Sequence, residues 1–153
     1  AIQVVRNNGF AGLKGLLPPS SRRGLVLMDP SYELKTDYGQ VTATVQDALQ
    51  RFATGCYVVW YPIIARQEAH DLPRRLKALA SKAGKGWLHA TLTVKSSKMT
   101  ALQDKRPGLP ASGMFVINPP YTLRAALQPA LVQMQALLGQ DRHAAHTLEV
   151  SGG

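Results

Sequence analysis

The chain has 153 residues, of which 45% are hydrophobic, and its 18 Lys and Arg residues against 9 Asp and Glu residues give a formal net charge of +9. That length and apolar content fit one folded domain and exclude a disordered basic tail, and a single cysteine excludes a disulfide scaffold. The charge indicates a polyanionic partner, most often a nucleic acid, with a merely solvated basic surface as the alternative.

The first third of the chain predicts short elements. Apolar residues predict a strand over residues 2–5, followed by a turn at Asn7-Asn8-Gly9, because Asn-Gly is a strong turn signal. A short helix over residues 11–17 is expected to end at Pro18-Pro19, which cannot continue it. The continuous apolar run over residues 24–28 fits a strand that is buried on both faces of a sheet.

A helix is expected next, with apolar residues at helical spacing and either Thr36 or Asp37 as its cap. Its apolar positions are Val41, Val45, Ala48, Leu49 and Phe52. Residues 56–61 predict a second buried strand, which Pro62 closes, and residues 66–82 predict a second long helix.

Two more strands, a loop and a helix are expected in the last third. Apolar and polar residues alternate over residues 87–95, which is typical of a half-exposed antiparallel strand with His89 on its exposed face. A basic loop over residues 96–112 leads to a strand over residues 113–117, and apolar spacing predicts a helix over residues 123–138.

The order of these elements predicts an α/β fold. The first four strands alternate with helices, which favours a parallel sheet wound by right-handed crossovers. The last two strands are joined by a loop, so we expect an antiparallel pair at the edge of the sheet. An exposed edge strand invites self-association with another chain. We assign residues 1–150 to one domain and residues 151–153 to a disordered tail.

The loop Asp29-Pro30-Ser31-Tyr32 carries the candidate chemistry. It follows the strand over residues 24–28, and open α/β sheets bind their ligands at the carboxyl ends of strands. The exocyclic amine of a nucleobase suits this loop, because the amine can donate to the Asp29 carboxylate and the Pro30 carbonyl while the ring stacks on Tyr32. Such stacking contributes about 1–3 kcal/mol per base. The alternative is an ordinary Asp-Pro turn after a strand.

Asn118-Pro119-Pro120-Tyr121 competes with this loop. As a bare pattern it matches the (Asp/Asn/Ser)-Pro-Pro-(Tyr/Phe) motif of adenine-N6 and cytosine-N4 methyltransferases better than Asp29–Tyr32 does. In class I methyltransferases, however, the motif ends the fourth of about seven strands. A helix, a strand, a helix and two strands are expected after Tyr32, whereas one helix is expected after Tyr121. We therefore assign the chemistry to Asp29–Tyr32 and interpret Asn118–Tyr121 as a turn.

A closer resemblance rests on three separated segments, GLKGLLPPSSRRGLVLMDPSYELKTDY, RFATGCYVVWYPII and LPASGMFVINPPY. In this order they resemble the bacterial 23S ribosomal RNA adenine-N6 methyltransferase J family, which is also associated with the catabolism of external DNA. The resemblance covers about residues 4–125. It implies a class I, Rossmann-like fold, S-adenosylmethionine as the cofactor, and methyl transfer to the N6 amino group of an adenine in 23S ribosomal RNA.

The resemblance also assigns residues to the site. Asp29, Pro30 and Tyr32 match the family's catalytic motif, although a serine replaces its usual second proline. Asn8 stands where the family commonly has an acidic residue before Gly-Phe, near the adenine of the cofactor. We therefore expect Asn8, Gly9 and Asp29 to contact the cofactor.

Further side chains are expected at the substrate. Trp60, near the end of the strand over residues 56–61, is expected to flank the base together with Tyr32, and packing in the core is the alternative for Trp60. Lys35 follows the motif and is expected to contact a phosphate, as are basic residues in or beside the loop over residues 96–112. The alternative for these basic residues is a solvated face.

The family's glycine-rich first motif, which cradles the methionine end of the cofactor, is not found in the 153 residues. The chain therefore resembles the carboxyl-terminal half of the enzyme, and we expect the isolated chain to transfer no detectable methyl group. The alternative function is that of a non-catalytic nucleic-acid-binding protein or a DNA-utilisation protein.

His143 and His146 share an i, i+3 spacing that would place two metal ligands on one helix face. No third ligand accompanies them, so we expect a solvated tail and no metal. The apolar runs are far shorter than the roughly 18 residues needed to span a bilayer, and the first residues lack the layout of a signal peptide. We therefore expect no membrane contact and a cytoplasmic protein.

Overall fold

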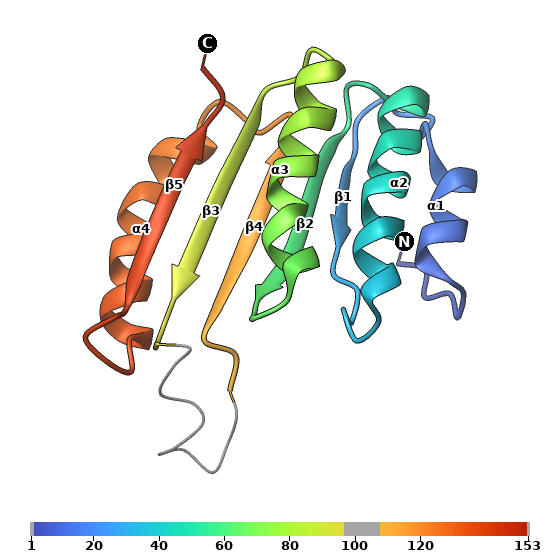
Figure 1. Ribbon diagram of the computed structural model, residues 1–153. Coiled ribbons are helices and arrows are strands. Elements are labelled where there is room, and N and C mark those ends of the chain that lie inside the picture. The colour runs from blue at the N-terminus through green and yellow to red at the C-terminus, as the bar shows by residue number, and fades with distance from the viewer. Residues whose placement is uncertain (1, 97–107, 153) are drawn as a thin grey trace.

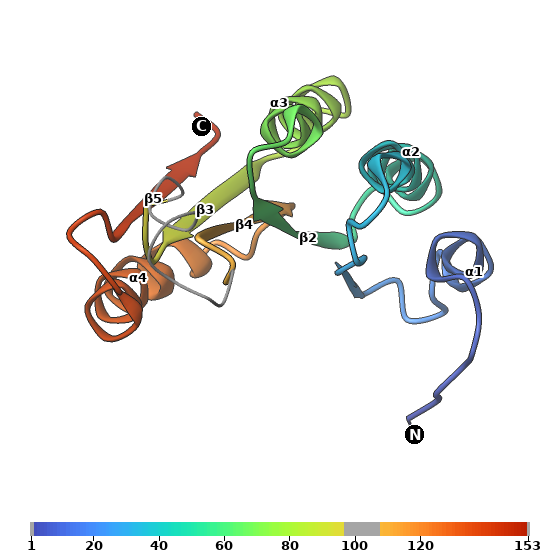
Figure 2. The same cartoon turned by 60° about the horizontal axis from the view of Figure 1, so that its bottom comes forward.

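A five-stranded sheet forms the centre of the molecule, and helices lie on both of its faces (Figure 1 and Figure 2). The computed structural model describes residues 2–96 and 108–152. The elements are α1 (Gly9–Leu16), β1 (Leu25–Met28), α2 (Lys35–Arg51), β2 (Cys56–Ile63), α3 (Gln67–Lys82), β3 (Trp87–Thr93), β4 (Ala111–Ile117), α4 (Leu123–Leu138) and β5 (Ala145–Val150). Helices α2 and α3 pack on one face, with α1 beside α2, and α4 packs on the other face. The predicted α/β class is confirmed.

The order of the strands in the sheet is β1-β2-β4-β3-β5. β1 and β2 pair in parallel, whereas β4 pairs antiparallel with β2 on one side and with β3 on the other. The predicted antiparallel pairing of residues 87–95 with residues 113–117 is therefore confirmed, but the predicted place of this pair at the edge is wrong. Because β4 finds a partner on each side, it separates β3 from β2, and these two strands are not parallel neighbours.

The expected solvated tail after α4 is instead a strand, β5. It pairs antiparallel with β3 along Leu88–Thr93. Its partly buried residues Leu148 and Val150 pack against the α4 side of the core. Ser151 continues the pairing, since its N–H donates to the Trp87 carbonyl at 2.9 Å. The free backbone groups along β3 thus gain partners, which the polar sequence of this segment does not reveal.

Residues 2–5 form no strand, contrary to expectation. Ile2 and Val4 are each 95% exposed, because no described strand lies beyond β1 to pair with them. The expected turn at Asn7-Asn8-Gly9 is also wrong, because Asn8 caps α1. Its Oδ1 accepts a hydrogen bond from the Ala11 N–H at 3.2 Å, which satisfies one of the free N–H groups in the first helical turn.

β1 is buried on one face and exposed on the other. Val26 and Met28 join the core on the α2 side, whereas Leu25 and Leu27 are 63% and 60% exposed. The predicted burial on both faces is therefore wrong. The reason is the position of α4, which contacts β3 and β5 and leaves this face of β1 uncovered within the described residues.

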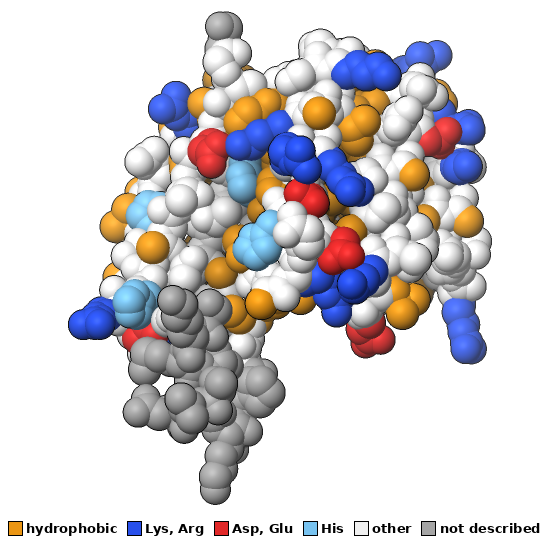
Figure 3. Space-filling view, viewed as in Figure 1, with side chains coloured by type: hydrophobic (Ala, Val, Ile, Leu, Met, Phe, Trp, Pro, Cys, Tyr) orange, Lys and Arg blue, Asp and Glu red, His pale blue; other side chains and the backbone are white. Residues whose placement is uncertain are grey.

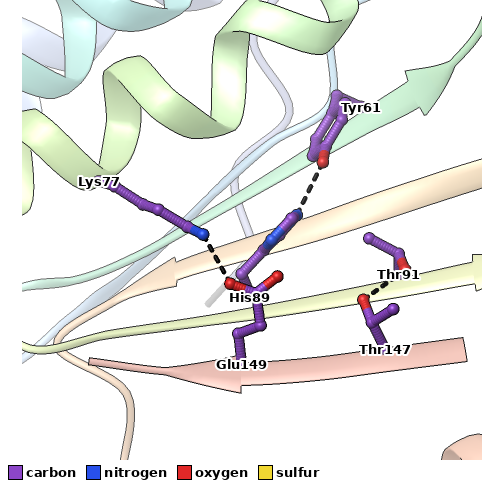
Figure 4. A network of polar contacts seen from close by, with 6 residues as sticks. All are labelled: Tyr61, Lys77, His89, Thr91, Thr147 and Glu149. Carbon is purple, nitrogen blue, oxygen red and sulfur yellow. Dashed lines mark hydrogen bonds and ion pairs between the residues drawn. The ribbon is translucent and has the colours of Figure 1, made fainter. Parts of the chain in front are cut away.

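His89 is buried beneath α3, and its expected place on an exposed face is wrong (Figure 4). Its Nε2 lies 2.7 Å from the Tyr61 hydroxyl, and its ring centroid is 5.6 Å from that of Phe115. Beside it, Lys77 of α3 donates to Glu149 of β5 at 2.7 Å. β3 carries a partner strand on each side and a helix above, so His89 on its polar face is enclosed.

Candidate active site

The loop that follows β1 lies at the carboxyl edge of the sheet and contains Asp29, Pro30 and Tyr32. Met28 pairs with Val59 in the parallel ladder of β1 and β2, so both strands run toward this edge. Helix α2 begins just after the loop and returns across the sheet (Figure 1). Ligands of open α/β sheets bind at this kind of edge.

A pocket of about 320 Å³ adjoins the loop. It is bounded by α1, β1 and α2, and its lining residues are Gly9, Phe10, Leu13, Val26, Leu27, Met28, Asp29, Pro30 and Thr44. Two of the residues predicted to contact the cofactor, Gly9 and Asp29, are thus brought together from distant parts of the sequence. Most of the wall is apolar, and Asp29 adds a carboxylate.

Asn8, the remaining residue predicted to contact the cofactor, does not line this pocket. Its side chain is exposed, and its Oδ1 is engaged with the Ala11 N–H as the cap of α1. The cap fixes the start of α1 and therefore the position of Gly9 and Phe10 in the pocket wall.

Tyr32 is buried, with 2% of its surface exposed, and its backbone has a φ of +54° in the left-handed region. Its hydroxyl donates to the Trp60 carbonyl at 2.7 Å, and its ring centroid lies 4.7 Å from that of Tyr38. Burial is the main cause that raises the pKa of the Tyr32 hydroxyl well above its usual value, so the group stays a neutral donor. The two aromatic residues predicted at the base, Tyr32 and Trp60, are therefore neighbours.

Arg66 fixes the backbone of this loop, and the sequence pattern did not point to it. Its guanidinium donates to the Tyr32 carbonyl at 2.8 Å and to the Glu33 carbonyl at 3.4 Å. Arg66 lies between β2 and α3, so it joins the two neighbouring loops at the carboxyl edge. The sequence gives a weak signal for this role of Arg66, because the backbone carbonyl that it binds lies more than thirty residues away in the chain.

Lys35 lies at the same edge, in the first turn of α2. Its Nζ is 3.7 Å from the Glu68 carboxylate, and most of its side chain is exposed. An exposed ion pair of this length contributes little, so Lys35 stays free to contact another anion. Lys35 does not line the pocket beside Asp29. The basic loop predicted to contact phosphate falls largely outside the described residues.

The competing motif, Asn118–Tyr121, lies at the opposite edge of the sheet. It follows β4, which runs antiparallel to β2, and Ile117 pairs with Tyr57 at the start of β2. The Asn118 Nδ2 donates to the carbonyls of Ala53 and Gly55 at 3.0 and 2.8 Å. Its amide is therefore used to close a turn, far from the pocket of Asp29.

Among the described residues, no group of three His, Cys, Asp or Glu side chains is arranged to hold a metal ion. His143 and His146 do not share a helix: His146 lies in β5 and bonds the Gln135 Oε1 at 2.6 Å, and the His143 N–H donates to Asp141. Within residues 2–96 and 108–152, every helix is too short or too polar to cross a membrane.

The sequence model of the family described as ribosomal RNA large subunit methyltransferase D, RlmJ, matches residues 1–149. Two curated proteins, each named ribosomal RNA large subunit methyltransferase J, are similar to this chain. The protein from Haemophilus influenzae is 39% identical over 148 residues, which cover 97% of this chain and 50% of that protein. The protein from Escherichia coli K12 is 38% identical over 137 residues, which cover 89% of this chain and 45% of that protein.

A crystal structure of a protein from Legionella pneumophila is similar with a TM-score of 0.76 and 26% identity, covering 96% of this chain and 50% of that one. The chain spans about half the length of the curated relatives that it matches. The resemblance carried by the three sequence segments is confirmed by the match over residues 1–149. This chain belongs to the family of ribosomal RNA large subunit methyltransferase D, RlmJ.

Proposed function

We propose that this chain is the carboxyl-terminal part of an S-adenosylmethionine-dependent enzyme that methylates the N6 amino group of an adenine in 23S ribosomal RNA. The names of the two curated relatives support the reaction class and the RNA. The observation that carries the proposal is the pocket in which Asp29 and Pro30 face Gly9 and Phe10. The proposed location is the cytoplasm, as the resemblance to bacterial 23S ribosomal RNA methyltransferases implies.

The pocket suits the adenosine end of the cofactor. Phe10, Leu13 and Val26 offer apolar surface for a flat ring, and the Asp29 carboxylate stands at the wall as an acceptor. Gly9 lacks a side chain, and nothing lies within 4 Å of the position a Cβ would take, so a ligand can approach the backbone there. When bound, S-adenosylmethionine supplies an electrophilic methyl group. The residues of this chain orient that methyl group relative to the target amine.

Asp29 and Pro30 act on the target amine. The lone pair of adenine N6 is delocalised into the ring, which makes the amine a poor nucleophile. Hydrogen bonds from the amine to the Asp29 carboxylate and the Pro30 carbonyl favour the pyramidal form, in which the lone pair is available for in-line attack. No strong base is needed, because positioning lowers the barrier.

Tyr32 and Trp60 hold the base, and Lys35 holds a neighbouring phosphate. The Tyr32 ring lies against Tyr38, so stacking on a base requires the ring to turn away and to release the Trp60 carbonyl. The loop keeps its shape during this movement, because Arg66 binds the backbone of Tyr32 and not its ring. A stacked base contributes about 1–3 kcal/mol, which offsets part of the lost hydrogen bond and of the lost packing of the buried Tyr32 ring.

The fold proposed for the whole enzyme is a class I, Rossmann-like sheet, of which residues 1–150 form the carboxyl-terminal half. β1 supports this assignment, because it has a partner strand on one side, while Leu25 and Leu27 are exposed. The remaining half of the relatives' length is expected to pair with this edge and to cover these leucines. The free edge also offers a route to self-association of the chain.

The test uses the enzyme completed with the amino-terminal half of the Haemophilus influenzae relative. Asp29→Ala is expected to abolish methyl transfer to unmodified 23S ribosomal RNA, measured with a labelled methyl group, while RNA affinity changes less than about threefold. The matched control is Asp47→Ala, which removes an exposed carboxylate that pairs with Arg51 outside the pocket. Equal losses of transfer and RNA binding, or transfer that survives Asp29→Ala, would contradict the proposal.

A further inference from the structure

A strongly basic surface covers the outer side of α3 and the turn after it (Figure 3). We call it the α3 basic surface and define it by Arg74, Arg75, Lys77, Lys82 and Lys85. Lysine and arginine side chains gather on this face of the molecule. Helix α4, which packs on the opposite face of the sheet, carries a single basic residue, Arg124. Five of the 18 Lys and Arg residues of the chain therefore lie on this surface.

Two members of the α3 basic surface are neutralised within the protein. Arg74 pairs with Asp71 at 3.0 Å, and Lys77 pairs with Glu149 at 2.7 Å. The Lys77 ammonium also lies 4.6 Å from the centre of the Trp87 ring. These contacts fix the two side chains in place and make them part of the fold.

The other three members, Arg75, Lys82 and Lys85, form no ion pair with any carboxylate of the described residues. Positive side chains without an ion-pair partner on a protein surface attract an anionic partner. Arg74 to Lys82 span about half of the 16-residue helix α3, about 12 Å, and Lys85 lies in the turn after it, so the surface covers the half of α3 that is farther from the active-site loop.

Two adjoining grooves between α2 and α3 give this surface its shape. One has a volume of about 300 Å³ and includes Gln50 and Lys85 in its walls. The other has a volume of about 360 Å³ and includes Arg75. Both are lined by Gln46, Leu79 and Lys82, so they form one continuous channel. Their walls thus combine apolar side chains such as Leu79 with the amides of Gln46 and Gln50 and with the positive charges.

The geometry points to the phosphate backbone of an RNA helix as the partner of the α3 basic surface. Neither groove is lined by an aromatic residue, and sequence-independent binding of single strands relies on aromatic stacking. Lysine and arginine recognise phosphate oxygens, and glutamine amides hydrogen-bond phosphate oxygens and 2′-hydroxyls. That the polyanion is RNA rests on the proposed function.

Helix α3 itself connects this surface with the active-site edge, because the basic residues begin at its middle, at Arg74. Helix α3 begins next to Arg66, whose guanidinium holds the loop of Tyr32. An RNA helix lying along α3 would therefore lead toward Asp29 at one end. Its role is to hold the structured RNA that flanks the target adenine, whereas the loop after β1 holds the base itself.

The test compares two charge-reversal variants that change the net charge equally. The first carries Arg75→Glu, Lys82→Glu and Lys85→Glu. The control carries three reversals at positions that line neither groove: Lys14→Glu, Arg124→Glu and Arg142→Glu. Affinity for a labelled RNA hairpin is measured by fluorescence anisotropy between about 0.05 and 0.3 M salt. A second set with glutamine at the same positions covers the case in which a glutamate variant does not fold.

We expect the first variant to bind the hairpin at least about tenfold more weakly, and the slope of log affinity against log salt to fall by about 2–3. The control variant should stay within about threefold of the parent chain. Binding of an unstructured single strand of the same length should change equally in both variants. Equal weakening of hairpin binding by the two variants, or no weakening, overturns the inference.

The same variants separate this inference from the proposed reaction. In the completed enzyme, the reversals at Arg75, Lys82 and Lys85 should raise the KM for RNA at least about tenfold and leave kcat within about twofold. If hairpin binding weakens as expected but Asp29→Ala still permits methyl transfer, the proposed function fails and the α3 basic surface stands. If kcat falls while hairpin affinity is unchanged, the α3 basic surface fails.

Discussion

At the scale of single residues, buried polar side chains organise the interior beneath α3. His89 contacts Tyr61 through Nε2 and lies near the ion pair of Lys77 and Glu149 (Figure 4). Its Nδ1 has no hydrogen-bond partner among the described residues. Burial is the largest cause that lowers the pKa of His89, opposed by the negative charge of Glu149 and reinforced by the positive charge of Lys77. The folded protein therefore holds His89 in its neutral form.

This shift in pKa predicts how stability depends on pH. Below the ordinary histidine pKa of 6.5, His89 binds a proton in the unfolded chain but not in the folded chain. The free energy of unfolding should therefore fall as the pH drops from about 6.5 to 5, by at most about 1.4 kcal/mol per pH unit. Above pH 7 the residue is neutral in both states and contributes no pH dependence.

Urea denaturation at a series of pH values measures this effect. His89→Gln should remove most of the slope between pH 6.5 and 5. The matched control is His70→Gln, since His70 is exposed and its replacement should leave the slope intact. A slope that survives in His89→Gln would contradict the assignment.

At the scale of elements, the insertion of β4 between β2 and β3 depends on one close approach. The Tyr61 ring crosses over Gly113 of β4, and a Cβ at Gly113 would overlap it. The same ring reaches His89 on β3 through its hydroxyl. Glycine at this position therefore lets a side chain of β2 span β4 and contact β3.

Gly113→Ala is expected to lower the free energy of unfolding by about 1–3 kcal/mol, because Tyr61 or the strand must move. Gly39→Ala is the matched control: Gly39 lies within α2, and a Cβ there meets nothing within 4 Å. Its replacement should raise stability by about 0.5–1 kcal/mol, since alanine favours helix. Equal effects of the two replacements in urea denaturation would argue against the contact between Tyr61 and Gly113.

At the scale of the whole molecule, this chain covers about half of its curated relatives, and the active-site pocket is bounded by α1, β1 and α2. The glycine-rich motif that binds the methionine end of the cofactor in this family is not found in the 153 residues. We therefore expect the isolated chain to bind RNA and to transfer no detectable methyl group.

A filter-binding assay with labelled S-adenosylmethionine and unmodified 23S ribosomal RNA tests this expectation. The isolated chain should transfer no more labelled methyl group than the isolated chain with Asp29→Ala. The chain joined to the amino-terminal half of a relative should transfer the methyl group to the RNA. Transfer by the isolated chain alone would show that the pocket beside Asp29 is sufficient.

Local sequence determined the elements whose signals are short-range. Apolar spacing at Val41, Val45 and Ala48 predicted α2, and the run over residues 56–61 predicted β2, because burial against one neighbouring layer leaves a periodic pattern. The position of Asp29–Tyr32 directly after a strand was also predicted from the sequence, together with the family. These features depend on contacts that each segment makes with a generic apolar surface.

Tertiary structure alone decided which strands are neighbours and which polar residues are enclosed. Four features join residues that lie far apart in the sequence. They are the place of β4 inside the sheet, the strand β5, the burial of His89, and the hydrogen bond from Arg66 to the Tyr32 carbonyl. Backbone hydrogen bonds between strands carry no side-chain signature, and a histidine or arginine is equally compatible with solvent or with a buried partner. The sequence therefore determined helices and strands such as α2 and β2 and the position of the loop Asp29–Tyr32. The pairing of the strands in the sheet determined which residues surround them.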